Sequence, residues 1–322
     1  MGFLEEMRGQ PEALGRLLNF YRHTGSEQLE QARALLDRGL ILLLGMGSSY
    51  FAGLYGAVLL NLQGVPATAI EASGSTIEAR ALLQQAALWI LISQSGQSPE
   101  VVRLARWVER TTTVLSITND VESPLAEASD VILPLLAGSE TATTSSTYTN
   151  TLGLLAVLAG WDIKALTRAA REMDEALAAP YDSAGPTSDV LTVIGRGLSL
   201  TSAHQTALIL REGAHLTATA YSGGAFRHGP LEWVGPGKQF IVFMGSEPHR
   251  AMQQRLVTDI TNRGANVFTV GDSPNDSWRA PAEEPALGPL IEILPMERFM
   301  VAAAEARGLV PGELSAKVTQ QE

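Results

Sequence analysis

The 322-residue sequence predicts an α/β fold built twice in tandem, with a parallel sheet in each half covered by helices on both faces. Two observations support this prediction. Short apolar runs alternate with stretches of helical periodicity, which is typical of buried parallel strands joined by helices. The same pattern then restarts after residue 186, and a glycine-rich turn that includes Gly45 recurs at Gly195.

The first half is expected to begin with two helices over residues 1–38, where leucines recur at helical spacing. Helical periodicity also covers residues 51–62, 100–109 and 146–178. Four apolar runs, each too short for a helix of its own, predict strands at residues 40–44, 89–92, 113–117 and 131–133.

The second half has apolar runs that predict strands at residues 190–194, 240–244, 267–270 and 291–294. Four prolines within residues 272–289 predict an exposed loop. Residues 180–186 have the composition of a linker. We therefore expect N-terminal helices at 1–38, a first subdomain at 39–180, a second at 187–300, and a C-terminal helix and tail at 301–322.

The repeated turn has the pattern GxGxS in both halves, at Gly45–Ser49 and Gly195–Ser199, and it aligns without a gap. Each copy follows an apolar strand and opens a helix, which favours duplication over chance. Such a turn suits an anion, because a helix start presents free N–H groups and a positive dipole end. A dinucleotide site would need glycine where Tyr50 and Leu200 stand, and no Gly-Lys-Ser/Thr of a P-loop follows.

Two further polar runs follow predicted strands, and both are candidates for binding a phosphate. The first is Ser93-Gln94-Ser95-Gly96-Gln97-Ser98, whose hydroxyl and amide groups can donate to phosphate or simply cap the next helix. With Ser48 and Ser49 it would lie at the carboxyl ends of strands, where doubly wound sheets bind ligands. The second run, residues 140–149, is either a plain loop or part of a sugar-phosphate cradle.

The composition excludes several classes of function. The chain has no cysteine, which excludes disulfides, thiolate metal sites and a cysteine nucleophile. Its net charge of −11 disfavours nucleic acid and anionic membrane surfaces as partners. No apolar run reaches the ~18–20 residues of a membrane span, and we expect a cytoplasmic protein. The histidine spacing offers no metal site, and no cofactor is expected.

Acid–base candidates lie in the second half. Glu212 stands on the helix opened by the second turn, and His228 lies sixteen residues later, before a Gly-Pro pair. On their own, a lone glutamate of this kind is more often solvated, and a lone histidine beside Gly-Pro is more often a structural turn residue.

Taken together, these strings resemble the sugar isomerase (SIS) domain family, and more closely the isomerase half of glucosamine-6-phosphate synthase and its stand-alone relatives. The resemblance spans essentially the whole chain, in order. Its matching pieces are Glu6 with Gln10-Pro11-Glu12, residues 45–50, 93–98 and 140–152, Gly195-Arg196-Gly197, Ala220-Tyr221, His228-Gly229-Pro230-Leu231 and residues 314–319.

The resemblance implies two flavodoxin-like SIS subdomains and a homodimer with its site at the subunit interface. It assigns proton transfer between C1 and C2 to Glu212, ring opening to His228 and contact with the open-chain carbonyl to Lys317. Family residues that would contact the substrate fall on Ser48, Ser49, Ser93, Gln94, Ser95 and Ser98 for the phosphate, and on Glu140 and Ala142 elsewhere in the site. The implied ligand is a sugar phosphate, and the implied activity is aldose–ketose isomerisation or deamination of an aminosugar phosphate.

Three departures from the synthase bear on this expectation. The chain has neither a cysteine nor an amidotransferase domain, so glutamine-dependent synthesis is not expected. Gln205 and Ile209 replace a glutamate and a lysine of the synthase, and Ile209 cannot ionise. Two alternatives stay open on this ground. One is a deglycase that cleaves a sugar–amino acid adduct, and the other is a sugar-phosphate sensor without catalysis.

Overall fold

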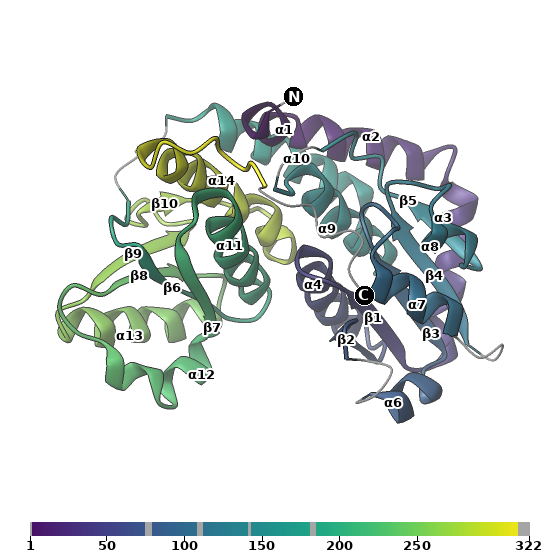
Figure 1. The fold of residues 1–322 in the computed structure, drawn as a ribbon, viewed down its shortest axis with the longest axis horizontal. Coiled ribbons are helices and arrows are strands. Elements are labelled where there is room, and N and C mark those ends of the chain that lie inside the picture. Colours follow the sequence, from purple (N-terminus) through teal and green to yellow (C-terminus); the bar gives the residue numbers. More distant parts are fainter. Residues whose placement is uncertain (1, 75–78, 108–111, 141–142, 181–184, 315–322) are drawn as a thin grey trace. The chain divides into compact units, whose positions relative to one another are not determined.

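The chain folds into two parallel five-stranded sheets flanked by helices, which confirms the predicted α/β class (Figure 1). The structure is a computed structural model that describes residues 2–74, 79–107, 112–140, 143–180 and 185–314. Its residues form two compact units. The N-terminal unit contains residues 9–140 and 146–167, and the C-terminal unit contains residues 2–8, 143–145 and the described part of 168–314.

The N-terminal sheet has the strand order β2-β1-β3-β4-β5, with every neighbouring pair parallel. Its strands are β1 (Ile41–Gly45), β2 (Ala67–Glu71), β3 (Leu88–Ile92), β4 (Thr113–Thr118) and β5 (Val131–Pro134). Its helices are α2 (Gln10–Arg22), α3 (Ser26–Ala34), η1 (Leu36–Arg38), α4 (Ser48–Leu62), α6 (Arg80–Gln85), α7 (Pro99–Trp107), α8 (Pro124–Glu127) and α9 (Ser146–Leu158), and α10 (Ile163–Ala178) begins in this unit.

Alternate residues of these strands pack against different helices, so both faces of the N-terminal sheet are covered. Leu42 and Leu44 join Trp89, Leu104 of α7 and Leu125 of α8 in one buried cluster. On the opposite face, Leu43 lies beside Gly53 and Gly56 of α4, where a side chain at Gly56 would also collide with Leu155 of α9. Strands buried on both faces read as continuous apolar runs, which is why their sequences predicted them.

The C-terminal sheet has the order β10-β9-β8-β6-β7, which is the same 2-1-3-4-5 order read from the other end. Its strands are β6 (Val190–Gly195), β7 (Thr217–Ser222), β8 (Gln239–Phe243), β9 (Asn266–Gly271) and β10 (Trp278–Arg279). Its helices are α1 (Phe3–Arg8), the end of α10, α11 (Ser199–Ala214), α12 (Gly223–Arg227), η2 (Pro230–Trp233), α13 (His249–Asn262), η3 (Pro285–Leu287) and α14 (Gly288–Ala306).

The two units share a local structure that agrees with the repeat in the sequence. Gly45 ends β1 and Gly195 ends β6, and each strand is followed by a helix, α4 or α11. The second glycine of each turn has a positive φ, 51° at Gly47 and 55° at Gly197, which side chains rarely adopt. In the C-terminal unit, α11 packs on α14, and α13 contacts β8 and β9.

The structure corrects several element predictions. Residues 291–294, predicted as a strand, lie inside helix α14, because a short apolar run fits a buried helix equally well. The predicted helix at 146–178 is two helices, α9 and α10, separated near Gly160, whose φ is 96°. Residues 3–34 form three helices where two were expected. The predicted loop at 272–289 contains β10 and η3, and its Trp278 is buried.

Candidate functional site

The first two polar runs leave the same edge of the N-terminal sheet. Strands β1 and β3 are neighbours, and their last residues, Gly45 and Ile92, are paired in register. The chain leaves β1 toward β2 on one side and returns to β3 on the other. The strand order therefore reverses between β1 and β3, and it is in the crevice at such a switch point that open α/β sheets bind ligands.

The first of these loops is a tight turn that places two serines at the start of α4. Gly47 precedes the helix with φ 51°, and the N–H of Ser49 donates to the carbonyl of Met46 at 3.0 Å. A side chain at Gly45 would lie 2.8 Å from the Cβ of Ser49, so only glycine allows this close return of the chain. Ser48 and Ser49 are both half-buried in the first turn of α4.

The second loop, from Ser93 to Ser98, is tied down by its backbone. The carbonyl of Gln94 accepts hydrogen bonds from the N–H of Asn119 at 3.0 Å and from Oγ1 of Thr118 at 3.2 Å. The hydroxyls of Ser93 and Ser98 are hydrogen-bonded to each other at 3.0 Å. Helix α7 begins directly after Ser98, so the run closes on a helix start.

Gly96 fixes the shape of this second loop. Its φ is 61°, and an added Cβ would lie 1.9 Å from Oγ of Ser123. The carbonyl of Gly96 also accepts a hydrogen bond from the N–H of Leu125 at 3.0 Å. The loop thus lies flat against the start of α8, and its serine and glutamine side chains are oriented by a backbone with little freedom.

The set of donors at this edge is neutral and suited to an oxyanion. Ser48, Ser49, Ser95 and Gln94 are half-buried, while Ser93 is 3% exposed. Hydroxyls, amides and the starts of α4 and α7 can together surround a phosphoryl group without a basic side chain. We call the residues Ser48, Ser49, Ser93, Gln94, Ser95 and Ser98 the phosphate cradle.

The third polar run is divided between a loop and a helix. Glu140 accepts a hydrogen bond from the N–H of Thr147 at 3.0 Å, so its carboxylate lies at the start of α9. A negative group there is stabilised by the helix dipole, which gives Glu140 a structural role in addition to any contact with a ligand. Ala142, the other residue expected here, lies outside the described residues.

Glu212 stands in the last turn of α11, in the C-terminal unit. It is half-buried, and this burial raises the pKa of its carboxyl, while the neighbouring Arg211 lowers it in part. Arg211 is held by a hydrogen bond from Nη1 to the carbonyl of Ala218 at 2.8 Å. A carboxyl whose pKa is raised can take up and return a proton at a pH closer to neutrality than a solvated carboxyl can.

His228 follows α12 in the same unit and is exposed. Its N–H donates to the carbonyl of Ala225 at 3.1 Å, which leaves the imidazole outside the helix. Within the described residues, no hydrogen bond joins the side chains of His228 and Glu212. Lys317 lies outside the described residues.

Gln205 and Ile209, which the resemblance aligns with ionisable residues of the synthase, are fully buried on α11. Ile209 brings only hydrocarbon to its position. The side-chain oxygen of Gln205 is buried without a hydrogen-bond partner within the described part of the chain. A neutral amide tolerates such burial far better than a carboxylate would.

Sequence reasoning did not find Glu292, a buried carboxyl of the C-terminal unit. Glu292 of α14 accepts hydrogen bonds from Oγ of Ser199 at 2.7 Å and from Oγ of Ser202 at 2.5 Å. Its burial raises its pKa, and the two serine hydroxyls lower it in part. The only signal in the sequence was that Glu292 is an acidic residue within the apolar run 291–294. That run predicted a strand and gave no indication of this contact.

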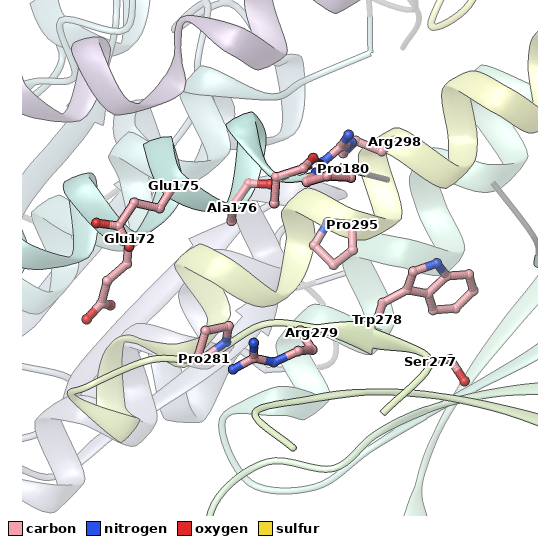
Figure 2. A pocket seen from close by; sticks show the side chains of 11 residues that line it. Glu172, Glu175, Ala176, Pro180, Ser277, Trp278, Arg279, Pro281, Pro295 and Arg298 are labelled. Carbon is pink, nitrogen blue, oxygen red and sulfur yellow. Dashed lines mark hydrogen bonds between the residues drawn. The ribbon is translucent and has the colours of Figure 1, made fainter. Parts of the chain in front are cut away.

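A pocket of about 410 Å³ lies elsewhere in the C-terminal unit, where the end of α10 meets β10 and α14 (Figure 2). Glu172, Trp278 and Arg298 are among its walls, and Arg298 donates to the carbonyls of Ala176 and Ala179. No predicted site residue among those described lines it. The described residues also contain no cluster of three or more histidine or acidic side chains that could hold a metal ion.

No helix in the described part of the chain has both the length and the apolar character needed to cross a bilayer.

Comparisons with known proteins identify related chains. Residues 34–159 match the model of the SIS domain. The isomerizing glutamine–fructose-6-phosphate aminotransferase of Bacillus subtilis is 28% identical over 333 residues, which cover 95% of this chain and 55% of that protein. The chain thus spans about half the length of the curated relatives it matches.

Solved structures with the same fold include a deaminase and an isomerase. Glucosamine-6-phosphate deaminase from Thermotoga maritima superposes with a TM-score of 0.77 at 18% identity, covering 98% of both chains. Tagatose-6-phosphate ketose/aldose isomerase from Escherichia coli gives 0.80 at 22% identity, covering 98% of this chain and 95% of that one.

Proposed function

We propose that this chain, which carries a SIS domain at residues 34–159 and is homologous to the isomerase half of glutamine–fructose-6-phosphate aminotransferase, is a sugar-phosphate enzyme that transfers a proton between C1 and C2 of its substrate. The reaction is aldose–ketose isomerisation, coupled to deamination when C2 carries an amine. The names of the solved structures with this fold, a deaminase and a ketose/aldose isomerase, are consistent with both forms.

Substrate binding is assigned to the phosphate cradle. Its hydroxyls, amide groups and two helix starts supply neutral donors, so the phosphoryl group is held despite a net charge of −11 on the chain. The bond between Ser93 and Ser98 and the backbone contacts of Gln94 orient these donors before the ligand arrives. Such preorganisation reduces the entropy lost on binding.

The observation that carries the proposal is the half-buried Glu212, whose carboxyl pKa is raised by burial. Isomerisation passes through an enediol, and one base that takes the proton from one carbon must return it to the other. A carboxyl partly shielded from water suits this role because its two protonation states are closer in energy at neutral pH.

His228 and Lys317 complete the proposed mechanism on the basis of homology. An imidazole can accept and donate a proton at neutral pH, which ring opening of a cyclic sugar requires. An amine beside the open-chain carbonyl can stabilise the developing oxyanion or condense with it. We further propose a cytoplasmic homodimer in which His228 serves the site of the partner subunit.

When the substrate is a 2-amino-2-deoxyaldose phosphate, the products follow from the balance of atoms. Proton transfer from C2 to C1, with loss of a proton from the amine and gain of one by the C1 oxygen, gives an imine at C2 and an alcohol at C1. Water then adds to this carbon, and ammonia leaves, giving the ketose phosphate. The chain's own residues supply the proton transfers, and no redox step is needed.

The test is a turnover assay over a panel of hexose and hexosamine 6-phosphates, with ammonia and ketose phosphate measured separately. Glu212→Gln should reduce kcat by at least about a hundredfold, the lower range for loss of a general base. Glu305→Gln, at an exposed glutamate of the same unit, is the matched control and should leave kcat unchanged. Binding without turnover of any panel member would instead support a sugar-phosphate sensor.

A second candidate, a deglycase acting on a phosphorylated sugar–amino acid adduct, is favoured by one observation. Ile209 is fully buried and apolar, where the synthase has a lysine. A deglycase would need the Glu212 and His228 pair but not that lysine. The two candidates differ in their nitrogen product, because the deglycase would release an amino acid in place of ammonia.

A further inference from the structure

The C-terminal sheet has its own switch point, and the residues there differ in chemistry from the phosphate cradle. Strands β6 and β8 are neighbours, with Ile194 paired to Val242. The turn Gly195-Arg196-Gly197 leaves β6 at this edge. The shared strand order makes this crevice the counterpart of the one that holds the cradle, so it is where a second ligand would be expected.

In this second crevice, Ser199 corresponds to Ser49, and its hydroxyl already has a hydrogen-bond partner within the protein. Ser199 donates its hydroxyl to the internal carboxyl of Glu292, which also accepts from Ser202. The hydroxyl proton of Ser199 is thus directed to Glu292 and not toward a ligand. The C-terminal unit therefore does not repeat the neutral cradle, and any ligand must be recognised by other groups.

Arg196 is the group that this crevice holds in a fixed orientation. Its Nε donates to Oε1 of Gln253 at 3.2 Å, and the Nε2 of Gln253 donates to the carbonyl of Phe243 at 2.9 Å. Gln253 is fully buried. A Cβ at Gly223 would lie 2.7 Å from Nε of Arg196, so the guanidinium packs directly against the backbone of this glycine.

Two further arginines lie near Arg196. Burial is the main cause that lowers the pKa of Arg196, and the charges of the nearby Arg227 and Arg255 lower it further. Arg227 is paired with Asp259 at 2.6 Å. Within the described residues, neither Arg196 nor Arg255 has a carboxylate within 4.0 Å. In the part of the chain that the structure describes, these three arginines have one carboxylate partner between them, Asp259, and the net positive charge that remains would attract an anion.

We propose that Arg196 and Arg255, with Arg227, form a second binding site for the phosphoryl group of a phosphorylated metabolite, at the carboxyl edge of the C-terminal sheet. Phosphate suits these residues because a guanidinium donates two parallel hydrogen bonds to its oxygens. The site belongs to a different sheet from the phosphate cradle and uses charged donors in place of neutral ones. It does not depend on the proposed catalytic activity.

The test follows the side-chain Nε–H signal of Arg196 by NMR during a titration with inorganic phosphate. The hydrogen bond from Nε to Gln253 slows exchange with water and makes this signal observable, and Arg196→Lys identifies it by its disappearance. The experiment uses Ser95→Ala, so that binding at the cradle is weakened. Arg255→Gln tests the second cation at an exposed position where folding is not at risk, and Arg279→Gln is the control at an exposed arginine of the same unit.

The expected result is a saturable shift of the Arg196 signal that survives Ser95→Ala and Arg279→Gln. In Arg255→Gln, the affinity for phosphate should fall about tenfold, as for loss of one charged hydrogen bond. An Arg196 signal that does not respond to phosphate would overturn the proposal, and so would equal affinities in Arg255→Gln and Arg279→Gln. Absence of turnover with sugar phosphates would count against the proposed function and leave this result unaffected.

Discussion

Gly96 should be the least replaceable residue of the loop from Ser93 to Ser98, which carries four members of the phosphate cradle, and Gly96→Ala tests the geometry of this loop. The φ of 61° at this position places an alanine in the left-handed region, which costs roughly 1–2 kcal/mol. The added Cβ would also lie 1.9 Å from Oγ of Ser123, and overpacking of this kind costs about 1–3 kcal/mol. Together the two effects should lower the free energy of unfolding by about 2–5 kcal/mol.

Gly64→Ala provides the matched control, because it separates backbone strain from the collision. Gly64 has φ 79°, but an added Cβ would meet no atom within 4 Å. Its replacement should therefore cost only the strain, roughly 1–2 kcal/mol. Urea unfolding followed by tryptophan fluorescence, to which the buried Trp89 of this unit contributes, measures both variants.

Binding separates the two variants further. To accommodate the new methyl group, the loop of Gly96→Ala must move away from Ser123, which displaces Ser95 and Gln94 from their positions. Calorimetry should show weaker binding of a hexose 6-phosphate to Gly96→Ala and unchanged binding to Gly64→Ala. Equal loss of stability in the two variants, or full affinity in Gly96→Ala, would refute this account of the loop.

Three further outcomes are expected. Burial raises the pKa of Glu292 in the folded state, so the stability that this carboxyl contributes is present at acidic pH and is lost as pH rises through the raised pKa. Glu292→Gln should therefore lower the urea midpoint less at pH 8 than at pH 5. An equal loss at both pH values would argue against the raised pKa. Burial also raises the pKa of Glu212, so kcat/KM should increase with pH around a carboxyl pKa that lies closer to neutrality than usual. A pH profile of kcat/KM that rises at the ordinary pKa of glutamate would contradict this role for Glu212. Arg298→Ala removes two hydrogen bonds to the carbonyls at the end of α10, so calorimetric unfolding should show a loss of about 1–3 kcal/mol, whereas Arg279→Ala should change little.

The sequence predicted the buried strands well because their burial on both faces leaves a continuous apolar run. β1 and β3 have no exposed residue, and both were found from their sequences. β2 and β7 were missed, because these strands are partly exposed and rich in alanine and threonine. Residues 291–294 were misassigned because four apolar positions do not reveal whether the run continues as a helix.

The proximity of the first two polar runs could be predicted for a topological reason. Polar runs that follow β1 and β3 must meet if these strands are neighbours, and the chain order of a doubly wound sheet makes them neighbours. The contact between Ser199 and Glu292 could not be predicted in this way. It joins residues 93 positions apart on two helices, and the repeat suggested that Ser199 would behave like Ser49.

Isotope exchange in heavy water tests the central claim most directly, because it detects the proton transfer assigned to Glu212 even when net conversion is small. The account predicts that the chain incorporates solvent deuterium at C1 or C2 of at least one hexose or hexosamine 6-phosphate, as seen by NMR. It also predicts that Glu212→Gln loses this exchange while still binding the phosphate. Exchange at an undiminished rate in Glu212→Gln, or no exchange in the unaltered chain with any bound sugar phosphate, would contradict the account.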